Sequence, residues 1–211
     1  MPIGSPSVPQ SSFLLPEEVS VTEEILETDP AGYVYRIGTE EEGMAWVGRE
    51  SASIEQPYPI DIEHIEHFAE GIQDPNPLYW SEEFGHQTRW GGRIAPWGVI
   101  VLTSEHRVWR PEWMEAQQES STFFMTVPLP GNRLLATNYE IECFAPLRPG
   151  DRVFKTELLE SIVPKTFRVG VGHQVTVKAF FRNHHGELCI TDSRTVFRYR
   201  FGTGAGYGPA G

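Results

Sequence analysis

The last third of the chain constrains the fold most strongly, because its sequence pattern predicts a series of long strands joined by short turns. The strand-like runs span residues 134–144, 153–162, 169–182 and 188–200. The segments between them carry turn signals and span residues 146–151 (PLRPGD), 164–166 (PKT) and 183–187 (NHHGE). Parallel neighbours need a crossover of a dozen or more residues, so these short connections predict an antiparallel meander.

The middle of the chain has helical patterns instead. Asp61 is placed to cap a helix over residues 62–71, whose apolar stripe comprises Ile62, Ile65, Phe68 and Ala69. Ser81 begins a short helix through residue 86, and a longer apolar helix is expected over residues 97–108, after Pro96. A helical segment followed by a meander predicts an α+β fold, in which an antiparallel sheet wraps one central helix.

Two other segments complete the expected organisation. Residues 32–37 (GYVYRI) are the best candidate for a further strand. Residues 74–80 (DPNPLYW) hold two prolines and an Asx residue, which predicts a shaped loop without regular structure.

The length of 211 residues suits a single domain, which we expect over residues 13–201. Residues 1–12 are rich in Pro, Ser and Gly, and residues 202–211 are rich in Gly, so both predict flexible tails. The formal charge of −12 disfavours nucleic acid and anionic membranes as partners. No apolar run reaches the roughly 18 residues of a membrane-spanning helix, and no signal-peptide pattern opens the chain.

The cysteine content agrees with a cytoplasmic protein. Cys143 and Cys189 are the only two cysteines, and they lack CxxC spacing. Both lie in strand-like runs, so we expect two buried free thiols rather than a disulfide or a zinc site.

The segment from Phe68 to Ile100, FAEGIQDPNPLYWSEEFGHQTRWGGRIAPWGVI, resembles the signature of MaoC-like hydratases and dehydratases. FAPLRPGD at 144–151 and VGVGHQVTVKAFFRNHHGEL at 169–188 resemble later segments of the same family. VGRES at 47–51 resembles the opening of its N-terminal, FAS1-like dehydratase branch. The resemblance extends over roughly residues 43–200.

This resemblance implies a hot-dog fold, usually paired with a second hot dog. It implies a coenzyme A or acyl-carrier-protein thioester as substrate, with no cofactor, and reversible addition of water across a 2,3-double bond. Active members carry an Asp-x-Asn-Pro-x-His loop, whose carboxylate and imidazole can together activate one water. Backbone N–H groups at the start of the central helix hold the thioester oxygen, where negative charge develops.

The chain departs from the family pattern at the position of the catalytic base. Asp74, Asn76 and Pro77 match the family loop, but Tyr79 stands where the family has His. An unperturbed tyrosine has a pKa of about 10, which makes it a poor general base at neutral pH. The thioester-side His-Gly is also changed, to Pro96-Trp97-Gly98. In double-hot-dog relatives a broken dyad marks the half that shapes the acyl tunnel while its partner carries out the chemistry.

Candidate catalytic residues are therefore Asp74 and Tyr79, with a turn-capping carboxylate and a packed aromatic as the structural alternatives. Candidate substrate-binding residues lie near the start of the expected central helix, with one in the strand segments. They comprise Asn76, Gly92, Arg93, Pro96, Trp97, Gly98 and Lys165. The basic members could steer a CoA phosphate, as could Arg89, Arg107, Arg110 and Arg168, or they could be solvated and interface residues. His64 and His67 share helical spacing but lack a third ligand, so no metal site is predicted.

Three functions remain open at this level. The first is the substrate-shaping subunit of a heteromeric enoyl-CoA hydratase, and the second is a self-sufficient hydratase using Asp74 with Tyr79 or His86. The third is a non-catalytic module that binds acyl thioesters. An unpaired sheet edge also predicts a homodimer, or a heterodimer or heterotetramer with another hot-dog subunit.

Overall fold

The computed structural model describes residues 25–30, 33–104 and 122–200. The predicted tails, and the end of the predicted central helix at residues 105–108, lie outside these residues. The described strands are β1 (Ile25–Thr28), β2 (Val34–Ile37), β3 (Ile54–Glu55), β4 (Arg133–Cys143), β5 (Val153–Phe167), β6 (Gly170–Asn183) and β7 (Leu188–Tyr199). The described helices are α1 (Glu40–Met44), α2 (Ile62–Gly71), α3 (Pro77–Trp80), α4 (Glu82–His86), α5 (Val99–Ser104) and α6 (Phe123–Thr126).

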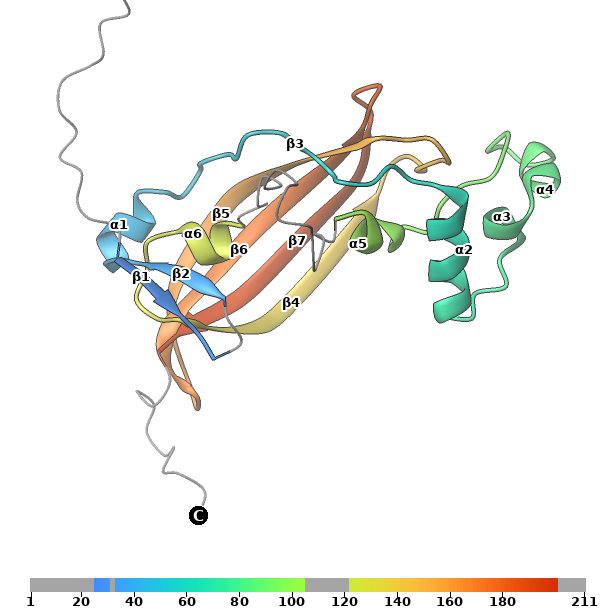
Figure 1. The fold of residues 1–211 in the computed structure, drawn as a ribbon. Coiled ribbons are helices and arrows are strands. Elements are labelled where there is room, and N and C mark those ends of the chain that lie inside the picture. Colours follow the sequence, from blue (N-terminus) through green and yellow to red (C-terminus); the bar gives the residue numbers. More distant parts are fainter. Residues whose placement is uncertain (1–24, 31–32, 105–121, 201–211) are drawn as a thin grey trace, which may run out of the picture.

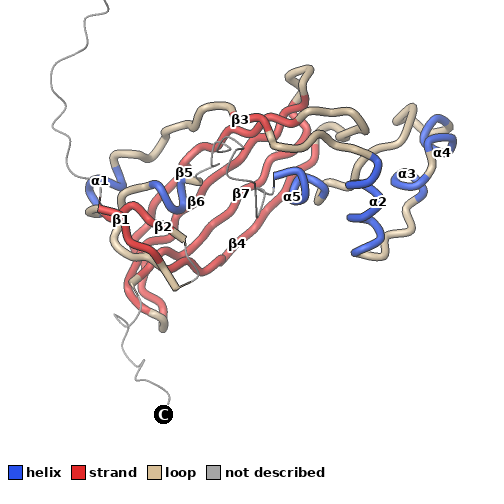
Figure 2. The backbone as a smooth tube through the Cα atoms, viewed as in Figure 1, coloured by secondary structure: helices blue, strands red, loops and turns tan. Residues whose placement is uncertain are grey.

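A five-stranded antiparallel sheet in the order β3-β5-β6-β7-β4 forms the body of the fold, as the meander predicted. Figure 1 shows the long strands β4 to β7 curving past α5 and α6, which lie against one face of the sheet. Helices α2, α3 and α4 lie beyond one end of the sheet, and the separate β1–β2 hairpin lies at the other end (Figure 2).

Alternation along β6 shows which face of the sheet is buried. Val175, Val177, Ala179 and Phe181 are buried, whereas the residues between them are partly exposed. Two apolar clusters cover this concave face. The first joins α2 and α5 to the sheet through Ile65, Val99, Ile100, Phe181 and Ile190. The second joins α6 to the far end through Phe123, Leu159, Val175 and Val196.

The predicted central helix begins at Val99 rather than at Trp97, and Val99 and Ile100 are buried at 0% and 2% exposure, while Val101 is 43% exposed. The caps agree with the sequence: the Asp61 carboxylate accepts from the backbone N–H of His64, and the Ser81 hydroxyl accepts from Phe84. Together with the wrapped antiparallel sheet, these elements confirm the α+β hot-dog architecture.

Several local expectations were wrong. Residues 164–166 are not a turn, because β5 continues through them and turns only after Phe167. Residues 77–80 form one helical turn, α3, since Pro77 stands at its first position, where no N–H is needed. Ile62 is exposed rather than part of the buried stripe, and Cys143 is exposed because β4 is the edge strand.

The predicted strand at residues 32–37 appears as β2, but it pairs with β1 rather than with the main sheet. The strand that extends the main sheet is the two-residue β3, which pairs with Phe154 and Lys155 of β5. No helix among the described residues is long and apolar enough to cross a membrane.

Candidate functional site

The family loop lies directly after α2 and is held by its own polar groups. Gln73 adopts a positive φ of 57°, which reverses the chain so that the Asp74 N–H donates to Ala69 O at 2.9 Å. The Asp74 carboxylate accepts from the Asn76 N–H at 3.0 Å, and its carbonyl accepts from the Trp80 indole at 2.8 Å. Asp74 therefore has the turn-capping contacts of its structural alternative.

Asn76 caps α3, because its side-chain oxygen accepts from the Leu78 N–H at 3.2 Å. This cap and Pro77 fix the one-turn helix that presents Tyr79. The Tyr79 side chain is partly buried and packs against the first apolar cluster. The loop thus holds an aromatic where the family holds an imidazole.

Tyr79 lines a cavity of about 200 Å³ between the loop, the start of α5 and the end of the sheet. The walls are mostly apolar and comprise Tyr79, Trp90, Ile94, Ala95, Trp97, Cys143, Phe144, Ala145, Pro146, Leu147 and Ile190. Drug-sized ligands occupy pockets of roughly 300–1,000 Å³, so this cavity is small for a complete acyl-CoA site. Trp97 and Phe144 are 48% and 56% exposed, so two large aromatic side chains stand uncovered beside it.

The substituted segment before α5 shapes the side of this cavity. Pro96 is buried and has no backbone N–H, whereas Trp97 lines the cavity. Gly98 lies against Phe68 of α2, whose ring would approach an added Cβ to 2.1 Å. The glycine is therefore required for the close approach of α2 and α5.

Arg93 makes structural contacts with the neighbouring helices. Its guanidinium donates to the Glu66 carboxylate at 2.8 Å and to the Trp80 carbonyl at 2.7 Å, with 11% of the side chain exposed. Its backbone N–H donates to Glu82, which also lies 2.9 Å from where a Cβ on Gly92 would stand. These contacts join α2, α3 and α4, and they favour the structural alternative for Arg93 and Gly92.

Lys165 is distant from the cavity along the sheet. It pairs with Gly172 near the β5–β6 turn, whereas the cavity residue Ile190 pairs with Phe181, nine positions further along β6. At about 3.3 Å per residue the two ends lie roughly 30 Å apart. Lys165 and the cavity therefore do not share a site within one chain. Arg107 and Arg110 lie outside the described residues.

The histidines do not assemble a metal or catalytic cluster among the described residues. His86 is 62% exposed and lies 3.2 Å from Glu82 on its own helix. His64 lies 2.8 Å from its helix cap Asp61. His173 of β6 is buried and contacts Glu40 of α1 at 3.1 Å.

Sequence reasoning missed two parts of this architecture. Residues 143–147 supply one wall of the cavity, and the FAPLRPGD segment, which carries part of the family resemblance, was the signal that could have placed them there. Arg198 is completely buried and donates to backbone carbonyls, including those of Gly131, Val127 and Leu129. A lone arginine in a strand gave no signal for that role.

A family model for the FAS1-like dehydratase domain region matches residues 45–192. The chain belongs to this family, within the MaoC-like hydratases and dehydratases. A curated relative, the probable enoyl-CoA hydratase alpha subunit of Thermomonospora curvata, is 28% identical over 162 residues, which are 74% of this chain and 50% of the relative. The chain thus spans about half the length of that relative.

Solved structures agree on the fold. A chain of the ChsH1-ChsH2 complex from Mycobacterium tuberculosis matches with a TM-score of 0.62 at 17% identity, covering 77% of this chain and 96% of that one. The MaoC-like dehydratase from Rhodospirillum rubrum matches with a TM-score of 0.50 at 23% identity, covering 73% and 92%. At these identities the likeness establishes the hot-dog fold.

Proposed function

We propose that this chain is the substrate-shaping half of an enoyl-CoA hydratase, paired with a hot-dog subunit that carries the complete catalytic dyad. The observation that carries the proposal is Tyr79, which lines the cavity from the position of the family histidine. Water must lose a proton as it attacks the β-carbon, and this requires a base whose pKa lies near the working pH. A phenol does not meet that requirement at neutral pH.

The retained aspartate does not replace the missing base. Asp74 accepts a backbone N–H within its own turn, and no histidine among the described residues contacts it. His86, the rival base, lies beside Glu82 and is not a wall of the cavity. These contacts support a loop whose scaffold persists without the acid–base pair.

The substrate we propose is an acyl thioester. The cavity is mainly apolar, as an acyl group requires, and it ends at the segment that precedes α5. The N–H groups of Trp97 and Gly98 have no acceptor among the described residues, so they are available to a thioester oxygen. Pro96 has no backbone N–H, so this segment offers fewer donors to a thioester oxygen than the His-Gly segment of the family does.

Assembly with a second hot dog follows from the open edge of the sheet. Strand β4 is an edge strand of 11 residues, and its Leu135 and Tyr139 are 46% and 48% exposed. An unpaired edge of this length favours pairing with another strand. The half-length match to a hydratase subunit and the likeness to a chain of a two-component complex agree with a partner subunit.

The test is to produce the full chain alone and together with a hot-dog protein, encoded nearby, that has an intact Asp-x-Asn-Pro-x-His loop. We expect a stable complex that hydrates crotonyl-CoA or longer enoyl-CoAs. The chain alone should be at least about 10²-fold slower, since one acid–base group typically contributes that much. Equal activity of the chain alone and the complex would contradict the proposal.

A gain-of-function variant sharpens this test. Tyr79→His restores the family pair, and we expect it to raise the activity of the chain alone. Tyr79→Phe is the matched control, because it keeps the aromatic wall but supplies no base, and it should leave the activity at the unmodified level. A large loss with Tyr79→Phe would show that the phenol itself takes part in catalysis.

A further inference from the structure

Charged side chains separate the two apolar clusters on the concave face of the sheet. Along β7 the inward side chains are Ile190, Asp192, Arg194 and Val196, since their partners on β6 are the buried residues Phe181, Ala179, Val177 and Val175. Ile190 belongs to the first apolar cluster and lines the cavity, while Val196 belongs to the second. A salt bridge therefore lies where the fold alone would predict apolar side chains.

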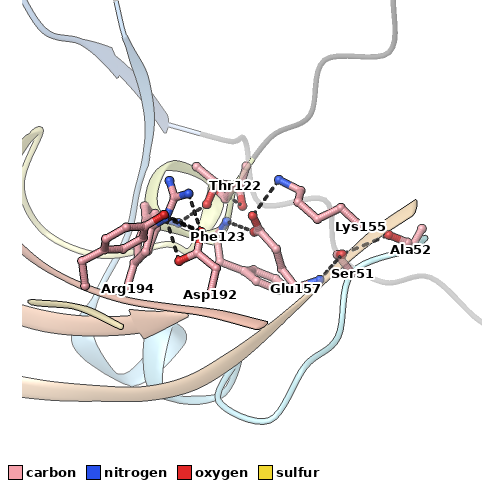
Figure 3. A network of polar contacts seen from close by, with 11 residues as sticks. Ser51, Ala52, Thr122, Phe123, Lys155, Glu157, Asp192 and Arg194 are labelled. Atoms are coloured by element: carbon pink, nitrogen blue, oxygen red, sulfur yellow. Dashed lines mark hydrogen bonds and ion pairs between the residues drawn. The ribbon is translucent and has the colours of Figure 1, made fainter. Parts of the chain in front are cut away.

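The salt bridge between Asp192 and Arg194 is tightly formed. Arg194 Nε lies 2.9 and 2.8 Å from the two carboxylate oxygens, and Nη2 also donates to the carboxylate. Tyr139 of β4, which faces Arg194 across the strands, donates its hydroxyl to Asp192 at 3.4 Å. Figure 3 labels Asp192 and Arg194 and marks the contacts between them with dashed lines.

The donor side chains of this group are exposed to solvent, while the acceptor carboxylate is buried. The Asp192 side chain is 1% exposed, whereas the Arg194 side chain is 46% exposed and Tyr139 is 48% exposed. A guanidinium carries five N–H donors, and those of Arg194 that contact Asp192 and Tyr139 do not use all five. The concave face thus presents an accessible guanidinium edge and a phenol above a buried carboxylate.

A second ion pair on the same face provides a contrast. Lys155 and Glu157 of β5 are in contact at 2.9 Å, with 14% and 7% of their side chains exposed. Glu157 also accepts the Phe123 N–H at 3.2 Å, so this pair is closed into the packing around α6 (Figure 3). The Asp192–Arg194 pair differs because it remains open to a ligand.

Packing alone does not require an ion pair at this place. Replacing a buried ion pair by apolar residues of similar volume is often neutral or stabilising. The neighbouring inward positions, Ile190 and Val196, are apolar. A charged pair that interrupts this stripe, with its donors exposed, therefore indicates recognition of a polar group.

The distance between the cavity and the salt bridge determines which part of a bound acyl group could contact the salt bridge. Asp192 lies two residues beyond Ile190 on the same face, or about 7 Å along the strand, and Arg194 lies about 13 Å beyond it. An acyl group that fills the cavity and continues along β7 would meet this pair with its distal end. A purely hydrocarbon end would have to desolvate the guanidinium without giving it a hydrogen bond.

We propose that Arg194 and Tyr139 form the distal subsite of the acyl site and select acyl groups that carry a neutral oxygen, such as a hydroxyl or a carbonyl, at their far end. This subsite rests on the proposed function, because it takes the cavity beside Tyr79 as the acyl site. The oxygen accepts from an N–H group of Arg194, and where it belongs to a hydroxyl, its hydrogen is donated to the Tyr139 oxygen, whose own hydrogen points to Asp192.

A neutral oxygen fits better than a carboxylate. Asp192 already neutralises the guanidinium, so a second carboxylate would be repelled by the first. Burial, followed by the Asp192 charge, raises the pKa of Tyr139 above its ordinary value. The phenol therefore stays protonated at neutral pH, donates to Asp192 and keeps its oxygen as an acceptor for a ligand hydroxyl.

The experiment measures binding of enoyl-CoA esters by calorimetry to the complex of the full chain with its hot-dog partner, in which the motif aspartate of the partner is replaced by Asn so that the esters are not turned over. The probes are ω-hydroxy esters of increasing chain length, with unsubstituted and ω-carboxy esters of the same lengths. A hydrogen bond to a charged donor contributes about 1.5–3 kcal/mol, so at one matching length the hydroxy ester should bind at least about tenfold more tightly.

Three variants assign the effect to these residues. Tyr139→Phe removes only the partly exposed hydroxyl and should lower the preference for the hydroxy ester. The double variant Asp192→Asn with Arg194→Met removes both charges together, leaves no unpaired carboxylate, and should abolish the preference. Lys178→Met is the matched control, because it removes a β6 cation that forms an ion pair with Glu142 on the convex face, and it should change nothing.

The outcomes separate this proposal from the proposed function. Equal affinity for hydroxy and unsubstituted esters at every length would overturn the subsite alone. Tighter binding of the carboxy esters would overturn the choice of a neutral oxygen. Failure of every ester to bind would overturn the acyl site itself, and the subsite with it.

Discussion

The two ends of the sheet use polar side chains in opposite ways. At the far end Arg198 is fully buried, and its guanidinium donates to several carbonyls of the 127–131 segment and to that of Arg36. At the cavity end Asp74 and Tyr79 are partly exposed, and the Asp74 carboxylate accepts the backbone N–H of Asn76 in its own turn. The fold therefore depends on a polar group that no motif marks, whereas the motif residues hold their own loop in shape, in agreement with the non-catalytic role that we propose.

The largest expected effect is at the far end. Arg198→Met leaves several buried carbonyls without donors, at a cost of about 1–3 kcal/mol for each group left unsatisfied. We expect the free energy of unfolding to fall by at least about 3 kcal/mol, measured by urea denaturation. Arg182→Met is the control, because Arg182 is exposed and its guanidinium donates to the Gly186 carbonyl in the adjacent turn; it should change stability by less than about 0.5 kcal/mol. Similar effects of both variants would refute the contrast between the two ends.

The next effect concerns the approach of α2 and α5 beside the cavity. Gly98→Ala places a methyl group against the Phe68 ring and should destabilise the chain by about 1–3 kcal/mol. Gly71→Ala is the matched control, since an added Cβ there meets no atom within 4 Å. Thermal unfolding should separate the two variants. An unchanged Tm for Gly98→Ala would mean that the helices can move apart freely.

A smaller effect is expected at the helix cap below the loop. Asp61→Ala removes the acceptor for the His64 N–H and should cost about 1 kcal/mol. Asp61→Asn retains an acceptor and should restore most of the stability. Chemical denaturation of the three proteins would measure this difference, and equal losses for Ala and Asn would contradict the capping role.

The smallest expected effect is the difference in thiol labelling between the two cysteines, which can be measured while the fold stays intact. Burial raises the pKa of Cys189 to about 11, so at pH 8 it is a protonated thiol as well as inaccessible. Cys143 is exposed, and although burial also raises its pKa, its smaller thiolate fraction can still react. Mass spectrometry should therefore find one maleimide on the folded chain, at Cys143, and two after denaturation. Labelling of Cys189 in the folded chain would show that this end of the sheet opens.

Much of this architecture was predictable from local chemistry. The meander, the caps Asp61 and Ser81, and the buried helix after Pro96 all depend on interactions between residues close in sequence. The family loop was recognisable as well, down to Tyr79 in place of histidine. These features need no knowledge of the tertiary packing.

The errors arose where tertiary context decides the conformation. Pro164 suggested a turn, yet β5 continues through it, because β3 reaches only Lys155 and no described strand borders this part of β5. A missing N–H costs little on such an edge. Arg198 was overlooked because its acceptors are backbone carbonyls, which are the same in every sequence. The cavity required β4 and the 144–147 turn to meet α3, which no local pattern reveals.

The central claim is that this half shapes the site without supplying the base. The most direct measurement is kcat/KM of the complex after the same Asp→Asn substitution in each subunit, at Asp74 here and at the motif aspartate of the partner. We predict a loss of about 10²–10⁴-fold for the partner's substitution and less than about threefold for Asp74→Asn. A loss of 10²-fold or more for Asp74→Asn, in a complex that still assembles, would show that the chemistry takes place on this chain.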